Sequence, residues 1–179
     1  MKTRIALAAA LLAVAFSAAA QERPRIGLGI GIAPFAVPSM HAGVVSRTVE
    51  VYVPLALAPN IRLEPSLGLA TNDQPGNGVD TRDLTLGIGA FFVSRIAQTA
   101  DMYAGGRLKL NFAKVSVPGA EDSGTDLLLA GAFGGEVYLV PRLSLGAEAE
   151  LGLYQNSNVS GDDSGWFTTG IAFLRVYFG

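Results

Sequence analysis

The sequence predicts an all-β fold, an eight-stranded antiparallel transmembrane up-and-down β-barrel, and three observations lead to it. In eight segments apolar residues alternate with small or polar ones, which is the period of a β-strand. The connections between these segments are alternately short and long, as in barrels of outer membranes. Half of the 179 residues are hydrophobic and 16% are charged, yet Pro and charged residues interrupt any apolar stretch long enough for a membrane-spanning helix.

The N-terminal segment 1–20 is typical of a secretory signal peptide. Lys2 and Arg4 form a basic start, residues 5–16 form an apolar run, and small residues follow as a cleavage site. The apolar run is too short to span a bilayer as a helix. We expect cleavage after position 20, which leaves 21–179 as one outer-membrane barrel domain; the alternative is an uncleaved anchor.

Charge and cysteine content exclude several function classes. Without Lys2 and Arg4, 11 of the 13 basic residues remain against 15 acidic ones, a formal charge of about −4. This balance argues against nucleic acid as a partner, because nucleic acid requires a clustered basic surface. The absence of Cys excludes a disulfide scaffold, a thiolate metal site and the lipid anchor of a lipoprotein.

The first four predicted strands differ in the residues that alternate with their apolar ones. In 25–33, Ile and Leu alternate with Gly; in 47–58, Val and Leu alternate with Thr, Glu and Tyr. In 61–70, Ile and Leu alternate with Arg, Glu, Ser and Gly, and in 82–93, Leu, Ile, Ala and Phe alternate with Asp, Thr and Gly. Each segment therefore has one apolar face and one small or polar face.

The second four strands repeat this pattern. In 102–115, Leu and Phe oppose Arg, Lys and Asn; in 126–139, Leu, Phe and Val oppose Ala, Gly, Glu and Tyr. In 143–154, Leu opposes Ser and Glu, and in 166–178, Ala, Leu, Val and Phe oppose Thr, Arg and Tyr. The chain ends with the eighth strand.

The lengths of the connections predict which end of the barrel each one occupies. Short turns on one side and longer loops rich in Gly, Pro, Asn, Asp and Ser on the other indicate an even number of strands, with both chain ends on the periplasmic side. The short connections are 58–60, 94–101 and 140–142, and the longer ones are 34–46, 71–81, 116–125 and 155–165.

The composition of the polar face decides which face meets lipid. A soluble barrel such as a lipocalin also alternates, but its exterior is dense in charged and long polar side chains. Here the face opposite Val, Leu and Ile consists mainly of Gly, Ala, Ser and Thr with a few charges. We therefore expect the apolar face to point outward at lipid, where only a closed barrel pairs every backbone polar group.

The alternation that turns the apolar residues outward also predicts a charged lumen. An eight-stranded barrel has room inside only for side chains, and buried charges persist only when they are paired. We therefore expect the inward charges to form a network that plugs the barrel, and an ion-conducting pore is the alternative. These residues are Glu50, Arg62, Glu64, Asp83, Arg107, Lys109, Glu136, Glu148, Glu150 and Arg175.

Toward the external end, the residues predicted to point inward become apolar. A partly apolar upper lumen would admit a small hydrophobic ligand; the alternative is that these side chains pack against one another. The residues of this predicted upper-lumen pocket are Val115, Leu128, Tyr154, Phe167 and Ile171.

The alternation, the loop parity and the final strand Leu174-Arg175-Val176-Tyr177-Phe178 resemble the small outer-membrane barrels typified by the transmembrane domain of outer membrane protein A. The resemblance implies a bacterial outer-membrane location. It also implies that Tyr177 and Phe178 form the signal read by the barrel-assembly machinery, although Gly179 follows Phe178 here. The partners we expect are this machinery, outer-membrane lipid and lipopolysaccharide, and we expect a monomer.

Two further alternatives concern the long connections. Some outer-membrane enzymes that modify lipid A use a His with a Ser or acidic partner, and His41 beside Ser39, Asp122-Ser123 and Asp163-Ser164 supply such residue types. Asp162-Asp163 and Glu121-Asp122 are carboxylate pairs of the kind that bind Ca²⁺ or Mg²⁺. Both patterns are also ordinary loop composition, so we expect neither catalysis, nor a metal, nor a cofactor.

The function that we expect from the sequence is that of a non-enzymatic integral outer-membrane protein, structural or surface-interaction in role, with its lumen closed by charges. A barrel that binds or transports small hydrophobic molecules through its upper lumen comes second. A lipid A-modifying enzyme comes third. The sequence names no ligand, because irregular loops carry such specificity.

Overall fold

The computed structural model describes residues 26–32, 49–74 and 78–178. The predicted signal peptide, the first long connection 34–46 and His41 lie outside these residues.

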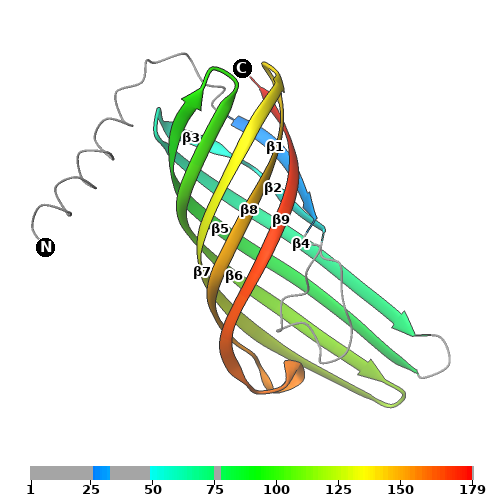
Figure 1. Cartoon of the computed structure of the whole chain (residues 1–179). Helices are drawn as coiled ribbons and strands as arrows, with labels where there is room; N and C mark the ends of the chain where they lie inside the picture. The colour runs from blue at the N-terminus through cyan, green and yellow to red at the C-terminus, as the bar shows by residue number, and fades with distance from the viewer. Residues whose placement is uncertain (1–25, 33–48, 75–77, 179) are drawn as a thin grey trace, which may run out of the picture.

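Nine antiparallel strands and one short 3₁₀ helix make up the described chain (Figure 1). Each predicted segment contains strand, and several strands extend beyond the predicted bounds. The elements are β1 (Ile26–Ile32), β2 (Val49–Tyr52), β3 (Leu55–Ala58), β4 (Ile61–Gln74), β5 (Val79–Ala97), β6 (Ala100–Val117), β7 (Ala120–Val140), β8 (Leu143–Gln155), η1 (Asn158–Ser160) and β9 (Ser164–Phe178).

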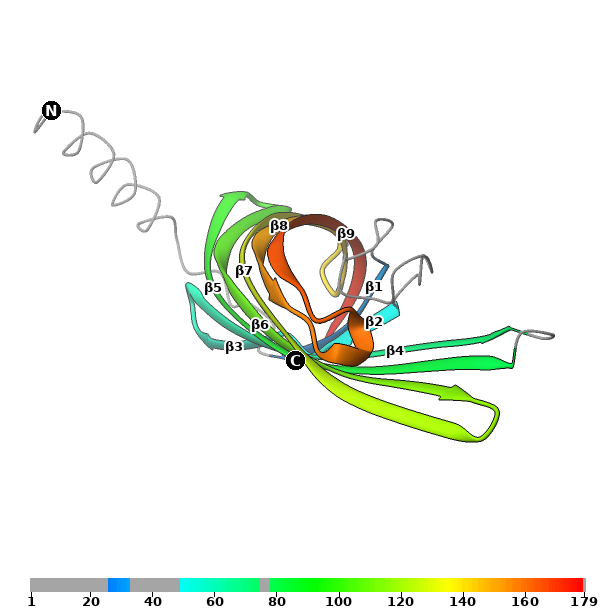
Figure 2. The same cartoon turned by 90° about the horizontal axis from the view of Figure 1, so that it is seen from below.

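The sheet closes into a ring of eight strand positions, which confirms the predicted barrel. β2 and β3 share one position, because both pair with β1 on one side and β4 on the other. From β4 to β9 each strand pairs with the next, and β9 pairs with β1 from Ile26–Phe178 to Ile32–Ala172. Figure 2 shows this ring nearly end-on. Closure leaves no unpaired strand edge within the ring.

The predicted second strand, 47–58, is not one continuous strand. It divides at Val53 and Pro54, because proline has no N–H to donate to the ladder. The surrounding backbone is still paired: the Val53 amide donates to the Pro65 carbonyl at 2.9 Å, and the Gly27 amide donates to the Pro54 carbonyl at 3.0 Å.

The apolar face of the strands points outward, as the sequence predicts. β1 alternates strictly between exposed Ile or Leu and buried Gly, and on β7 Leu129 is 56% exposed whereas Leu128 is 4% exposed. The aromatic residues Phe92, Phe178 and Trp166 also face outward. The wall of the barrel is therefore apolar outside, which suits a hydrocarbon surrounding.

Two of the predicted long loops are wrong. β4 and β5 continue to Gln74 and from Val79, and β6 and β7 are joined by the two-residue turn Pro118-Gly119, where Gly119 adopts a positive φ of 86°. These two hairpins project beyond the rest of the barrel (Figures 1 and 2). Gly, Asp and Ser within them suggested loops, but backbone pairing between neighbouring strands sustains the sheet despite weak local β-propensity.

The fourth long connection folds into a compact turn. η1 lies between β8 and β9, and the Asn156 amide donates to the Asp163 carbonyl at 2.8 Å across its base. Within the described residues, no helix has the length and apolar character needed to cross a bilayer.

Ile88→Arg tests the outward face. Ile88 is 45% exposed in the middle of β5, so the charged side chain would enter the hydrocarbon, and we expect a loss of about 2–4 kcal/mol in unfolding free energy. Urea titration of protein folded in lipid vesicles measures this loss. The control is Ser116→Arg, which lies on a projecting hairpin and should change stability by less than about 0.5 kcal/mol. Equal stability of Ile88→Arg and the native protein would contradict the face assignment.

Candidate functional site

The strongest candidate site is the interior of the barrel, where Arg107 is the central residue. Its side chain points inward from β6 and is 3% exposed. It binds Glu64 of β4 through Nη2 at 2.5 Å, and Glu148 of β8 through Nε at 2.5 Å and Nη2 at 2.9 Å. β4 and β8 stand four positions apart in the ring of eight. A single guanidinium group therefore bridges opposite walls of the barrel.

Two further arginines extend this cluster toward the end of the barrel where β9 ends. Arg175 of β9 donates to Glu64 Oε2 at 2.7 Å and to Glu136 Oε2 at 3.4 Å, and Arg62 donates to Glu136 Oε1 at 2.6 Å. Glu136 also accepts hydrogen bonds from the hydroxyl groups of Ser144 and Tyr177 at 2.8 Å each. Charge-assisted bonds of this kind satisfy carboxylates that would be costly to bury alone.

Lys109 continues the network on the other side of Arg107, toward η1. Its Nζ lies 3.1 Å from Glu50 of β2 and 3.3 Å from Glu150 of β8. Glu150 also lies 3.3 Å from Arg107 Nε, so one acid contacts both cations. The three arginines, Lys109 and their five glutamates form a continuous chain of contacts, which we call the lumen network.

Between the lumen network and η1, neutral side chains donate hydrogen bonds to two buried acids. The Asn111 amide donates to Asp83 and to Asp126 at 3.0 Å each. Asp126 also accepts from the backbone amide and hydroxyl of Ser157 and from the hydroxyl of Ser160, all at 2.8 Å. Asp126 thereby holds the η1 turn against this end of the barrel.

Sequence reasoning missed Asp126 and Asp101 as lumen residues. Asp126 begins the predicted sixth strand and shares the inward parity of Leu128, so alternation alone would have identified it. Asp101 lay in a predicted turn, but β6 starts before it, and it pairs with Arg95 at 3.3 Å and accepts from the Tyr138 hydroxyl at 3.1 Å. Both acids are 2% exposed or less.

The inward rings of Phe91, Tyr103 and Phe173 are a second feature that sequence reasoning did not identify. The guanidinium carbon of Arg175 lies 3.8 Å from the ring centre of Phe173, and that of Arg62 lies 4.3 Å from the ring centre of Tyr103. Such stacking favours a cation when it is desolvated. Tyr103 also packs edge-on against Phe91, with ring centres 5.1 Å apart.

Inward glycines make room for these long side chains. A Cβ atom added to Gly29 would lie 2.8 Å from Arg175 Cγ, and one added to Gly134 would collide with the Tyr103 hydroxyl group. The Gly-rich inner face therefore provides the space that the charged and aromatic side chains occupy.

The residues of the predicted upper-lumen pocket are brought together only in part. Leu128 and Phe167 are buried in one cluster with Ala130, and Tyr154 packs against it. Ile171 is buried outside that cluster. Val115 does not belong to it: this half-buried residue stands on a projecting hairpin opposite Asp122, beyond the part of the barrel where the other side chains meet.

The residues considered for catalysis or metal binding are not assembled into a site in the described chain. The Asp122 carboxylate accepts from the amide of Ser123 beside it at 2.9 Å, and Asp163 accepts from Tyr154 at 3.2 Å and Asn156 at 2.5 Å. Among the described residues, no group of three or more His, Cys, Asp or Glu is placed to hold a metal ion.

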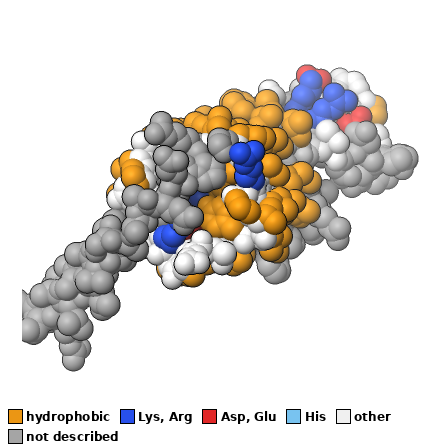
Figure 3. All heavy atoms as spheres, turned by 90° about the horizontal axis from the view of Figure 1, so that it is seen from above, with side chains coloured by type: hydrophobic (Ala, Val, Ile, Leu, Met, Phe, Trp, Pro, Cys, Tyr) orange, Lys and Arg blue, Asp and Glu red, His pale blue; other side chains and the backbone are white. Residues whose placement is uncertain are grey.

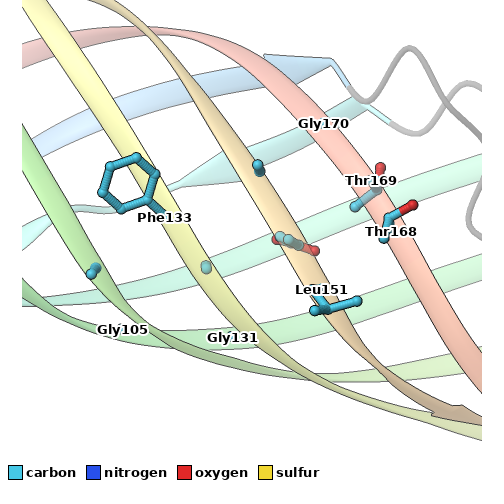
Figure 4. A pocket seen from close by; sticks show the side chains of 11 residues that line it. Gly105, Gly131, Phe133, Leu151, Thr168, Thr169 and Gly170 are labelled. Atoms are coloured by element: carbon cyan, nitrogen blue, oxygen red, sulfur yellow. The ribbon is translucent and has the colours of Figure 1, made fainter.

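A groove of about 860 Å³ lies on the outer wall, and one residue of the lumen network, Glu150, is among those that line it (Figure 4). Small residues such as Ala104, Gly131 and Ala149 line it, and Phe133 and Leu151 project beside them. These residues face outward, so the groove belongs to the lipid-facing surface.

Comparisons with known proteins agree with this architecture. The family model described as outer membrane protein beta-barrel domain matches residues 5–173. No protein among the curated sequences matches the chain.

Three solved structures share the fold. Neisserial surface protein A (NspA) is 18% identical, with a TM-score of 0.61, 86% of this chain covered and 96% of that one. Ail, the attachment invasion locus protein of Yersinia pestis, is 16% identical, with a TM-score of 0.56 and coverages of 85% and 95%. The N-terminal β-barrel domain of Pseudomonas aeruginosa OprF is 11% identical, with a TM-score of 0.58 and coverages of 88% and 100%.

Arg107→Ala tests the energetics of the lumen network. The change leaves Glu64 and Glu148 buried without their central cation, so we expect a loss of about 3–5 kcal/mol in unfolding free energy. Urea titration measures this loss, with Arg82→Ala, an exposed arginine on a projecting hairpin, as the control. A difference of less than about 1 kcal/mol between the two variants would mean that water hydrates the lumen acids.

Proposed function

The chain belongs to the outer membrane protein β-barrel domain family, and from this premise we propose that it is a non-enzymatic barrel of the bacterial outer membrane with a structural or surface-interaction role. In this proposal the lumen network closes the barrel to ions and solutes. The proposed partners are outer-membrane lipid, lipopolysaccharide and, through the terminal Tyr177-Phe178, the barrel-assembly machinery. The proposed state is a monomer.

The observation that carries the proposal is the contact of Arg107 with Glu64 and Glu148 on opposite walls. Lys109 makes a second bridge one layer further out, between Glu50 and Glu150. A pore would need a continuous aqueous path, whereas eight strands enclose only enough space for side chains. Two successive layers of paired charges occupy that space here.

The external end supports the same proposal. Ser157 and Ser160 bring the η1 turn onto Asp126, and Leu128, Ala130 and Phe167 pack against one another beneath it. This arrangement favours a filled upper lumen over a pocket for a small hydrophobic molecule, because the apolar side chains already bury each other's surface.

Conductance measurements test the closed lumen. We expect the mature protein, refolded and inserted into a planar lipid bilayer, to show no steady current steps in potassium chloride. We expect the triple variant Glu64→Ser, Arg107→Ser, Glu148→Ser to conduct, because it removes the central bridge without leaving one buried charge unpaired.

The matched control for this experiment is the double variant Asp80→Ser, Arg82→Ser, which removes two exposed charges from a projecting hairpin and should stay silent. Steady current through the native protein would refute the closed lumen. A silent triple variant that is correctly folded would show that closure does not depend on the Arg107 bridge.

A further inference from the structure

The external border of the lipid-facing surface falls on one cross-strand row of four neighbouring strands. On β4, β5 and β6, the outward residues change there from apolar to polar, and on β7 the change comes one row nearer the membrane, at Thr125. The row pairs Thr71 with Arg82, Arg82 with Lys114, and Lys114 with Ser123. On the next outward row toward the membrane lie Leu69, Leu84, Phe112 and Thr125.

Two cations occupy the centre of this border row. Arg82 and Lys114 are direct cross-strand partners, and like charges placed directly opposite each other destabilise a sheet. Most other basic residues of the described chain point into the lumen or pair with an acid, as the four cations of the lumen network do. Figure 3 shows charged side chains gathered on the projecting part, beyond the apolar wall of the barrel. An anion bound between these two outward cations would offset their repulsion.

The acids near this pair leave it accessible. Lys114 lies 2.8 Å from Glu121, but their side chains are 42% and 61% exposed, and an exposed ion pair of this kind contributes little. Arg82 is exposed and forms no ion pair with any acid whose side chain the structure describes. Asp80 and Glu121 stand one row further from the membrane. Asp83, next to Arg82 in the chain, is buried and accepts from the Asn111 amide. The adjacent outward row toward the membrane, Leu69, Leu84, Phe112 and Thr125, carries no carboxylate.

A groove of about 500 Å³ lies beside the two cations. Its lining includes Leu69, Leu84 and Phe112, which are 62%, 38% and 41% exposed. The groove therefore combines two cations at its polar end with an apolar floor that continues into the lipid-facing surface. This combination matches a ligand that joins a phosphate to hydrocarbon chains.

We propose that this groove binds a phosphorylated, acylated glycolipid of the outer leaflet, of the lipid A class. One phosphate lies between Arg82 and Lys114, and an acyl chain lies over Leu84 and Phe112. The inference rests on the outer-membrane location but not on the closed lumen, so lipid binding and conductance fail independently of each other.

Native mass spectrometry of the refolded mature protein, in an uncharged detergent and titrated with lipid A, tests the proposal. We expect Arg82→Ala, Lys114→Ala to weaken binding of bisphosphorylated lipid A at least tenfold. The charge-preserving variant Arg82→Lys, Lys114→Arg should retain most of the binding. Arg142→Ala, which removes an exposed cation from a periplasmic turn, is the matched control and should bind as the native protein does. Gel mobility before and after boiling verifies that each variant is folded.

Two further probes separate the phosphate from the acyl chains. Lipid A without phosphates should bind the native protein as weakly as bisphosphorylated lipid A binds the double alanine variant. The deacylated disaccharide bisphosphate and inorganic phosphate should each bind at least tenfold more weakly than the complete lipid. Unchanged binding by the double alanine variant, an equal loss in Arg142→Ala, or equal binding of the deacylated probe would each overturn the proposal.

Discussion

Closure of the backbone hydrogen-bond ladder is the constraint on which the rest of this structure depends. In hydrocarbon, an unpaired N–H or C=O group has no water to bind, so a membrane-spanning sheet must have no free edge. The pairing of β1 with β9 meets this condition. Once the sheet closes, successive side chains must face either lipid or lumen, and the charged residues of the spanning strands are confined to a narrow interior.

The confinement of charged side chains to the lumen determines how the interior is organised. Charges that cannot reach water need partners, and the lumen network supplies them in layers, with Arg107 between opposite walls and Lys109 one layer further out. Aromatic rings fill the space beside the guanidinium groups. Gly29 and Gly134 have no side chain and so leave room for the long side chains next to them. The proposed closed lumen and the proposed lipid site have the same cause. Charged side chains are excluded from the lipid-facing surface, so they lie either in the lumen or beyond the apolar border.

The sequence predicted the spanning part well and the external part less well. Alternation assigned the ten charged lumen residues to the inner face because the two-residue period of a strand is local. It failed at Pro54, where a missing N–H divides a strand, and in the projecting hairpins, where turn-forming residues lie inside paired strands. Outside the bilayer, polar residues suit both a loop and a solvated strand, so composition does not distinguish the two. Tyr103 and Asp126 were missed although their parity is readable.

The sequence by itself determined the class of fold, the direction of each face and ten of the charges that point inward, because each depends on neighbours two residues apart. Only the tertiary structure decided which acid meets which cation. Glu64 and Arg175 are separated by 111 positions, and their contact depends on the closure and relative shift of all the strands between them. That shift is a property of the whole ring, to which every strand pair contributes, and no local pattern encodes it.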